Sequence, residues 1–106
     1  MTVTFKESHV RTVEITMSHR LGFQFWLAAE FAQCMREFRS AIQVRQGDFF
    51  ADGKNIVELL ALEAPLGSHL EIKAVGDDAQ RAIASVEAFF LKPRDQGQRA
   101  ALKVVW

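Results

Sequence analysis

The apolar residues of this chain follow two different periods in turn, and that alternation constrains the fold more than any other feature. Val13, Ile15 and Met17 occupy every second position, a period of two that predicts a half-buried strand. From about residue 25 to 38, apolar residues recur at helical spacing and form one stripe. The same two periods predict further strands at 41–45, 49–51 and 69–74, and further helices at 56–61 and 77–92. Helices separated by strands and hairpins in this order favour one antiparallel sheet with helices on one face.

Turn and cap residues mark the ends of these elements. Gly47-Asp48 is a tight-turn signal between the second and third strands. Asn55 stands before the short helix, where Asn is among the preferred N-cap residues, and Pro65 stops that helix. Asp77, followed three residues later by Gln80, predicts a capping box at the start of the last helix.

Composition excludes several classes of function. The 106 residues suffice for one domain, and they include 13 basic and 13 acidic residues, which argues against nucleic acid as a partner. Cys34 is the single cysteine, so an internal disulfide is excluded, and we expect this thiol to be buried and structural. The three histidines show no metal-ligand spacing, so neither a metal nor a cofactor is expected. No apolar run approaches the roughly 18 residues that span a bilayer, and the first residues lack a signal-peptide pattern, so we expect a cytoplasmic protein.

One stretch before and inside the first predicted helix resembles a known motif. From Leu21 to Phe31 the sequence reads LGFQFWLAAEF. It resembles the Asn-Gly-Leu-His-x-Arg-Pro-Ala-Ala-x-Phe stretch of HPr proteins, the histidine-containing phosphocarriers of the sugar phosphotransferase system. The residues that match this stretch are Gly22, Ala28, Ala29 and Phe31. Further positions with residues similar to those of the family are Phe38, Ile42, Val44, Lys54, Gly67, Ile72, Gly76, Asp78, Gln80 and Ala82.

The resemblance implies a fold and a domain plan. It covers roughly residues 12–92 and needs no gap from about Gly22 to Phe90. HPr proteins are α+β, open-faced β-sandwiches in which three helices pack on one face of a four-stranded antiparallel sheet. We therefore expect residues 1–106 to form a single HPr-like domain with a core at about 12–92, an N-terminal arm and a C-terminal extension.

The departures from the family lie where its chemistry takes place. Gln24 stands at the phosphohistidine position, and a carboxamide nitrogen is no nucleophile because its lone pair is delocalised into the carbonyl. Trp26 stands where an arginine steadies the phosphoryl group, so one neutral donor replaces a charged fork. Asn55 replaces a serine that a regulatory kinase phosphorylates in some Gram-positive HPr proteins, a serine that the glutamine-bearing catabolite-repression paralogue keeps. The resemblance thus predicts a chain that has no catalytic residue, is not an enzyme and is unable to carry phosphate on histidine.

The altered positions predict a contact surface for a protein partner. In the family, the matching residues and those of the short helix face phosphotransferase partners, so we expect a regulatory protein-binding module related to that system. The predicted contact residues are Phe23, Gln24, Phe25, Trp26, Ile56, Val57 and Leu60. The alternative is that the N-terminal arm or the C-terminal tail covers the aromatic residues and makes them part of the core.

Two other functions are left open by the sequence. His19, five residues before Gln24 and next to Arg20, could be a displaced phosphoacceptor, although a solvated loop histidine is the favoured interpretation. His9 and His69 are interpreted as arm and strand-surface residues. A structural or oligomerising domain is the other alternative, with the aromatic residues and the tail forming a self-interface. The tail could also dock onto a sheet edge of its own chain or of a second copy.

Overall fold

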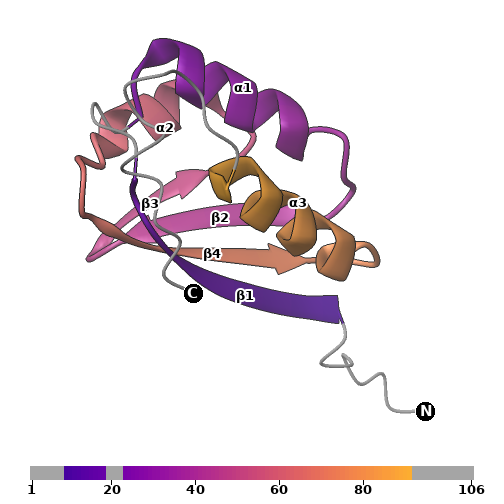
Figure 1. Ribbon diagram of the computed structural model, residues 1–106. Helices are drawn as coiled ribbons and strands as arrows, with labels where there is room; N and C mark the ends of the chain where they lie inside the picture. Colours follow the sequence, from indigo (N-terminus) through magenta and orange to yellow (C-terminus); the bar gives the residue numbers. More distant parts are fainter. Residues whose placement is uncertain (1–8, 19–22, 92–106) are drawn as a thin grey trace.

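The computed structural model describes residues 9–18 and 23–91, which form a layer of helices over an antiparallel sheet (Figure 1). The elements are β1 (Val10–Thr16), α1 (Phe25–Met35), β2 (Ala41–Gln46), β3 (Phe49–Asp52), α2 (Ile56–Leu62), β4 (His69–Val75) and α3 (Ala79–Leu91). The predicted order of strands and helices is confirmed, as is the expected α+β open-faced sandwich. The predicted N-terminal arm and C-terminal extension lie outside the described residues. Among the helices of the described ranges, none is long and apolar enough to cross a membrane.

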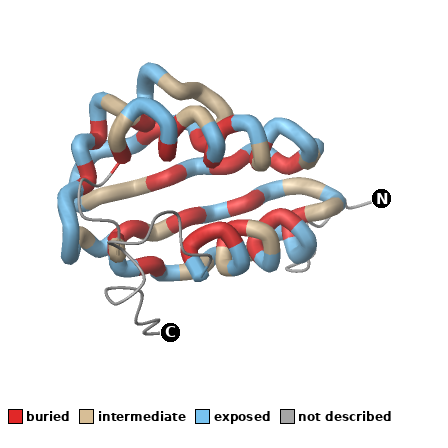
Figure 2. The backbone as a smooth tube through the Cα atoms, turned by 45° about the horizontal axis from the view of Figure 1, so that its top comes forward, coloured by how far each residue is buried: buried red, intermediate tan, exposed pale blue. Residues whose placement is uncertain are grey.

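The strand β4 lies inside the sheet, whose strand order is β1-β4-β2-β3 with every neighbouring pair antiparallel. Ile72 of β4 lies opposite Val13 of β1 on one side and opposite Val44 of β2 on the other. Residues directly opposite each other on antiparallel strands point to the same face, so these three side chains form one apolar row. The helices cover that face, and buried positions of both layers meet between them (Figure 2).

An aromatic cluster closes the core between α1 and α3. Phe31 of α1 is fully buried, and its ring meets the ring of Phe89 of α3 edge-on with centroids 5.2 Å apart. Phe23, just before α1, packs edge-on against Phe31 at 5.7 Å and against Phe90 at 6.3 Å. Such pairs add about 0.5–1.5 kcal/mol each beyond the burial of area. The cluster therefore fixes the start of α1 on the core.

The ends of two helices differ from their predicted positions: α1 stops before residue 38, whereas α2 runs to Leu62, one residue past its predicted end. α1 ends at Met35, because the amides of Glu37 and Phe38 bond three residues back, to Cys34 and Met35, and tighten the chain into a turn. Phe38 nevertheless packs half-buried against the core and completes the apolar stripe. α2 ends before Pro65, at a C-cap residue in the left-handed conformation, Glu63 with φ 53°.

The start of α3 differs from the predicted capping box. α3 begins at Ala79, and the carbonyl of Asp78 accepts the hydrogen bond from Ala82 N at 2.9 Å, so the helix starts one residue later than a cap at Asp77 would place it. The Asp78 carboxylate turns away from the helix. It accepts hydrogen bonds from Arg39 N at 2.9 Å, from Ser40 N at 3.0 Å and from Ser40 Oγ at 2.5 Å. A capping box at Asp77 is therefore wrong, and Asp78 ties α3 to the turn before β2.

Candidate partner-binding site at the start of the first helix

Gln24 is the residue at which the chain enters α1. Its backbone is extended, with φ −88° and ψ 174°, and its carbonyl accepts a hydrogen bond from Ala28 N at 2.9 Å, which makes it the N-cap. Its side chain makes no capping hydrogen bond, and the first turn of α1 carries no acidic residue. The unsatisfied N–H groups and the positive end of the helix dipole therefore lie at Gln24 without an anionic side chain from α1 to cap them.

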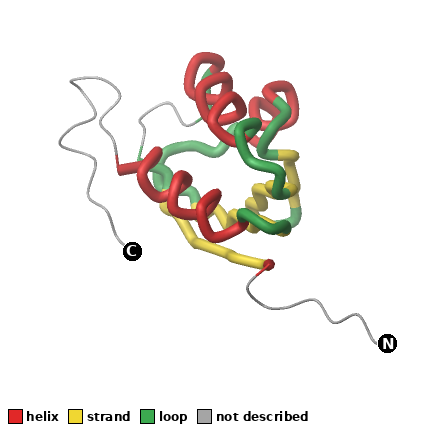
Figure 3. Tube along the Cα trace, turned by 90° about the vertical axis from the view of Figure 1, so that its right-hand side faces the viewer, coloured by secondary structure: helices red, strands yellow, loops and turns green. Residues whose placement is uncertain are grey.

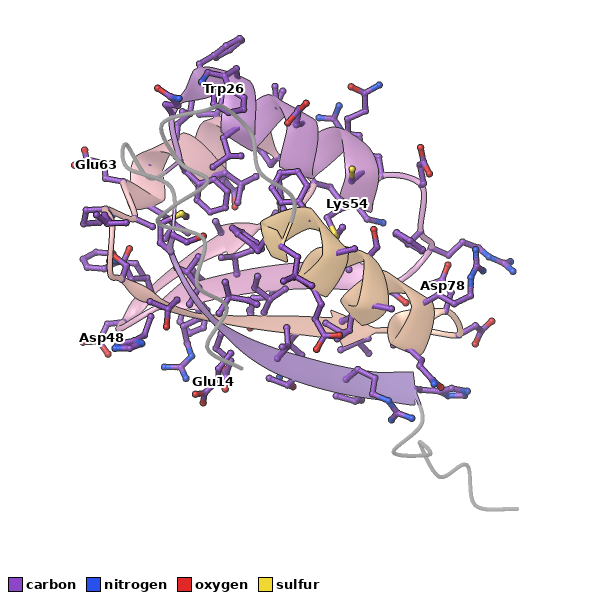
Figure 4. The ribbon with its side chains drawn as sticks, viewed as in Figure 1. Glu14, Trp26, Asp48, Lys54, Glu63 and Asp78 are labelled. Atoms are coloured by element: carbon purple, nitrogen blue, oxygen red, sulfur yellow. The ribbon has the colours of Figure 1, made fainter. Side chains whose placement is uncertain are left out.

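The three aromatic residues around Gln24 point in different directions. Phe25 is 67% exposed and Trp26 is 37% exposed, so both present apolar surface to solvent. Figure 4 shows Trp26 at the start of α1. Phe23 departs from the predicted contact surface, because it is only 4% exposed and packs into the aromatic cluster of the core. Sequence reasoning grouped the three because they are neighbours, but the turn of the backbone at Gln24 separates them.

The helix α2 supplies the second part of the predicted surface. The predicted N-cap is confirmed, since Asn55 Oδ1 accepts a hydrogen bond from Glu58 N at 3.1 Å. Val57 is 74% exposed, whereas Ile56 and Leu60 are half-buried and pack against the core. Val57 is thus the apolar side chain of α2 that is most available to a partner, and Ile56 and Leu60 offer only their outer atoms.

Hydrogen bonds fix how α2 lies against α1. Lys54 Nζ donates to the carbonyl of Phe38 at 2.6 Å, and Arg36 Nε donates to the carbonyl of Lys54 at 3.0 Å, so the beginning of α2 is tied to the end of α1. The two helices lie beside each other on the sheet (Figures 1 and 3). Figure 4 shows Trp26 at the start of α1 and Glu63 at the end of α2 toward one side of the molecule, with Lys54 farther along.

The site offers binding chemistry and no nucleophile among its described residues. The side chain at the N-cap is a carboxamide, and its neighbours are an exposed phenylalanine and an indole. His19, the proposed alternative phosphoacceptor, lies outside the described residues. His69 is an exposed residue of β4 and His9 immediately precedes β1, so neither belongs to α1 or α2. Within residues 9–18 and 23–91, no group of three or more histidine, cysteine, aspartate or glutamate side chains could hold a metal ion.

Sequence reasoning missed two other surface features. Phe49 and Phe50 of β3 are 72% and 57% exposed, although the hairpin pattern only marked them as a returning strand. Cys34 is half-buried, less than predicted, because it opens into a shallow groove of about 550 Å³ between α1 and α3. The groove is lined by Glu30, Gln33, Cys34, Glu37, Ser85, Ala88 and Phe89. Two adjacent phenylalanines beside a tight turn were the available signal for the first feature.

The α+β fold, with its candidate site around Gln24 at the start of α1, is that of the small phosphocarrier domains. Comparison with known proteins gives the family. Residues 11–92 match the family model described as "PTS HPr component phosphorylation site", so the chain belongs to the HPr family of the phosphotransferase system. It is 30% identical over 81 residues to the phosphocarrier protein NPr of Escherichia coli, an alignment that covers 76% of this chain and 88% of NPr.

Other relatives agree with this placement. The chain is 32% identical over 92 residues to the multiphosphoryl transfer protein of Xanthomonas campestris, which covers 83% of this chain but only 11% of that much longer protein. Among solved structures, HPr of Bacillus anthracis superposes with a TM-score of 0.71 at 25% identity, covering 76% of this chain and 95% of HPr. Crh, the catabolite repression HPr of Bacillus subtilis, matches with a TM-score of 0.61 at 27% identity over 67% of this chain and 82% of Crh.

Proposed function

We propose that this HPr-family protein carries no phosphate on a histidine and acts as a regulatory module that binds a protein partner. The observation that carries the proposal is Gln24 at the N-cap of α1, with a side chain that caps nothing and cannot form a phosphoramidate. In the resemblance to the HPr stretch, Gln24 aligns with the phosphohistidine. A cytoplasmic location belongs to the same proposal.

The neighbours of Gln24 support a loss of phosphate chemistry. Trp26 replaces the arginine expected two residues on, so this position lacks the charged donor fork that binds a phosphoryl group. Asn55 keeps the capping bond to Glu58 N that a serine would also make, but it offers no hydroxyl for a regulatory kinase. Asn55 thus keeps the structural role of its position, and neither position offers the phosphate chemistry of the family.

The same residues support a role in binding. Phe25 and Val57 are large apolar side chains that are 67% and 74% exposed, and they belong to two helices that pack beside each other. Phe25 stands at the start of α1, whereas Val57 stands at the start of α2, which is tied to the end of α1, so the two mark separate points of the helix layer. Exposed apolar side chains of this size are candidates for contact with a partner. A phosphocarrier surface that has lost its phosphoacceptor and gained aromatic area is suited to docking without group transfer.

Phosphoryl transfer from phosphoenolpyruvate tests the first half of the proposal. The full chain is incubated with phosphoenolpyruvate and a phosphotransferase-system enzyme I, and its intact mass is measured at alkaline pH, where phosphohistidine survives. We expect no gain of a phosphoryl group, while a histidine-bearing HPr protein in a parallel reaction gains one. A phosphorylated wild-type chain overturns the proposal.

Two variants make this result specific. Gln24→His together with Trp26→Arg restores both groups that the family uses, and a phosphoryl gain in this double variant shows that enzyme I still recognises the fold. His19→Gln tests the alternative phosphoacceptor. If the wild-type chain gains a phosphoryl group and this variant does not, the phosphate is carried by His19. That outcome would replace the proposed function by phosphotransfer through a displaced histidine.

Self-association is a second candidate function, favoured by the exposed Phe25 and Val57 and by one relative. The Crh structure at 27% identity is described as a swapped, intertwined dimer. Light scattering over a wide range of protein concentration distinguishes the candidates, because a self-associating chain gains mass as concentration rises. A monomer mass throughout, in the wild type and in Phe25→Ala, removes this candidate.

A further inference from the structure

The groove between α1 and α3 and the segment that follows α3 have complementary compositions. The groove has a volume of about 550 Å³, and both charged residues that line it are acidic. Residues 92–106 follow Leu91, the last residue of α3, and are mostly basic and apolar. We infer that residues 92–106 bind along this α1–α3 groove of their own chain and pair their lysine and arginine side chains with its carboxylates. This inference goes beyond the proposed function and does not depend on it.

The α1 side of the groove carries carboxylates beside a less exposed base. Gln33 and Cys34 are three and four residues after Glu30, so the three share one face of α1. Glu37 follows in the turn after α1, where its amide donates to the Cys34 carbonyl at 3.2 Å and holds it next to that face. Glu30, Gln33 and Glu37 are exposed, whereas Cys34 is half-buried. The two carboxylates therefore form the outer part of the groove.

The α3 side of the groove is less polar. It consists of Ser85, Ala88 and Phe89, and the ring of Phe89 is buried edge-on against Phe31 of α1. Among the described residues, neither lysine nor arginine lines the groove. Arg81, one turn before Ser85, lies over the ring of Phe38 at 5.7 Å from its centroid. The groove thus combines an apolar base with a negative rim.

The segment after α3 has the opposite charge. Residues 92–106 contain one acidic residue, Asp95, and four basic residues, which are Lys92, Arg94, Arg99 and Lys103. Arg99 and Lys103 alternate with two apolar stretches, 100–102 and 104–106, which include Leu102 and Trp106. A segment of this composition can bury its apolar side chains on the base of the groove while its cations stay near solvent beside the carboxylates.

The segment starts near the groove and is long enough to follow it. Phe89, which lines the groove, is two residues before Leu91, where α3 ends, and Pro93 has no N–H with which to continue the helix. The seven positions from Glu30 to Glu37 correspond to roughly 10 Å, whereas the fifteen residues 92–106 span up to about 50 Å when extended. A segment tethered this close has a higher effective concentration at the groove than a segment of another molecule.

Charge favours the groove over the start of α1 as the binding place. The first turn of α1 has no acidic residue and lies at the positive end of the helix dipole, which disfavours a basic segment. Glu30 and Glu37 instead attract the segment toward the later part of the same helix. Binding in the groove therefore leaves Phe25 and Trp26 uncovered, as the proposed partner site requires.

Contacts within the isotope-labelled full chain test the inference directly. Nuclear Overhauser effects are recorded at low protein concentration, and we expect them between Leu102 or Trp106 and the methyl group of Ala88. Arg99→Glu with Lys103→Glu should abolish these contacts, because like charges then face each other. Adding Glu30→Lys and Glu37→Lys to that variant exchanges the charges and should restore the contacts.

Reaction of Cys34 with iodoacetamide, a small neutral reagent, gives an independent readout, since Cys34 is the single cysteine and lines the groove. We expect Arg99→Glu with Lys103→Glu to react at least about threefold faster than the wild type, because the segment leaves the groove. If the segment stayed, its new carboxylates would raise the pKa of the thiol and slow the reaction, so a faster reaction identifies release. Lys103→Glu alone should keep part of this gain. The matched control, Lys73→Glu, makes the same change on the face of β4 away from the helices and should leave the rate unchanged.

The other outcomes contradict the inference. Contacts of residues 92–106 with Phe25 and Trp26, or with β1 or β3, would place the segment elsewhere. The absence of any contact with the groove, or a Cys34 rate that the segment variants do not raise, would show that the segment does not bind there. Protection of Cys34 that grows with protein concentration would assign the bound segment to a second copy. None of these measurements involves phosphoryl transfer, so the proposed function is tested separately.

Discussion

Asp78 shows how one side chain can join distant parts of the chain. Its carboxylate receives two backbone N–H groups and one hydroxyl from Arg39 and Ser40, which are nearly forty residues earlier in the sequence. Gly76 allows this approach: it adopts φ 151°, and a Cβ there would lie 2.7 Å from the Cα of Ser40. The Asp78 carboxylate can bridge the two segments because the backbones at Gly76 and Ser40 lie close together, and its hydrogen bonds in turn hold them there.

We predict that Asp78→Asn lowers the free energy of unfolding by about 1.5–3 kcal/mol at neutral pH, because hydrogen bonds to a charged acceptor are lost or weakened. The hydroxyl of Ser40 and the amide of Arg39 lower the pKa of Asp78 from 3.8 to about 2. Because the pKa of Asp78 is lower in the folded chain than in the unfolded chain, its charge stabilises the fold when the pH is above the ordinary pKa of 3.8. This contribution is lost as pH falls from about 3.8 toward 2.

Urea unfolding of wild type and variant at neutral pH and near pH 2 checks this prediction. The difference between them should be largest at neutral pH and shrink in acid. Asp77→Asn, at an exposed neighbour, is the control and should change stability little. A difference that stays constant with pH would mean that the charge of Asp78 contributes nothing.

Gln24 supports a second prediction at the residue scale. Because its side chain caps no N–H group, Gln24→Ser should increase the free energy of unfolding by about 0.5–1 kcal/mol through a new capping bond. Thermal or urea unfolding measures the gain, and Gln24→Ala serves as the uncapped reference. A loss of stability in the serine variant would show that the Gln24 side chain holds the fold in some other way.

At the scale of elements, α2 depends on its cap because it is only seven residues long. We predict that Asn55→Ala lowers the free energy of unfolding by about 1 kcal/mol, whereas Asn55→Ser stays within a few tenths of the wild type. Urea unfolding of both variants separates capping from side-chain size. A serine variant as unstable as the alanine variant would contradict the assignment of Asn55 Oδ1 to Glu58 N.

The elements that the sequence predicts well are those with a local cause. Ile15 and Met17 follow the period of two of a strand beside a core, and both are buried. Asn55 stands just before the apolar residues of α2, a position that predicts an N-cap, and its side chain does cap that helix. The early end of α1 at Met35 was not predicted, because Phe38 stays in the apolar stripe after the helix has become a turn.

Contacts between distant elements were beyond local reasoning. The burial of Phe23 depends on Phe90, and the turn of Asp78 away from α3 depends on Ser40. The candidate site was located from the sequence alone, because Gln24 stands at the phosphohistidine position of the resemblance, and its role in binding stays a prediction. Phe25, Trp26 and Val57 are exposed as a contact surface requires, but the burial of Phe23 was not predicted, because it depends on how the start of α1 meets α3.

The four strands of the sheet differ in how many contacts hold them in place. β4 pairs with β1 and β2 and lies under the helices, so its amides have partners on both sides and its apolar residues Leu70, Ile72 and Ala74 are buried. β1 and β3 each have one neighbour among the described strands, and β3 is only four residues long. Opening of the edges therefore requires less loss of contact than opening of the centre.

Amide hydrogen exchange should follow this order. We predict that amides near Ile72 in β4 exchange most slowly, at the rate of global unfolding, and that those of β3 exchange orders of magnitude faster. Edge strands are also where another strand can add. Protection of β1 or β3 equal to that of β4 would contradict the four-stranded sheet as an isolated unit. If such protection grew with protein concentration, the added strand would come from a second copy; if it did not, it would come from the same chain.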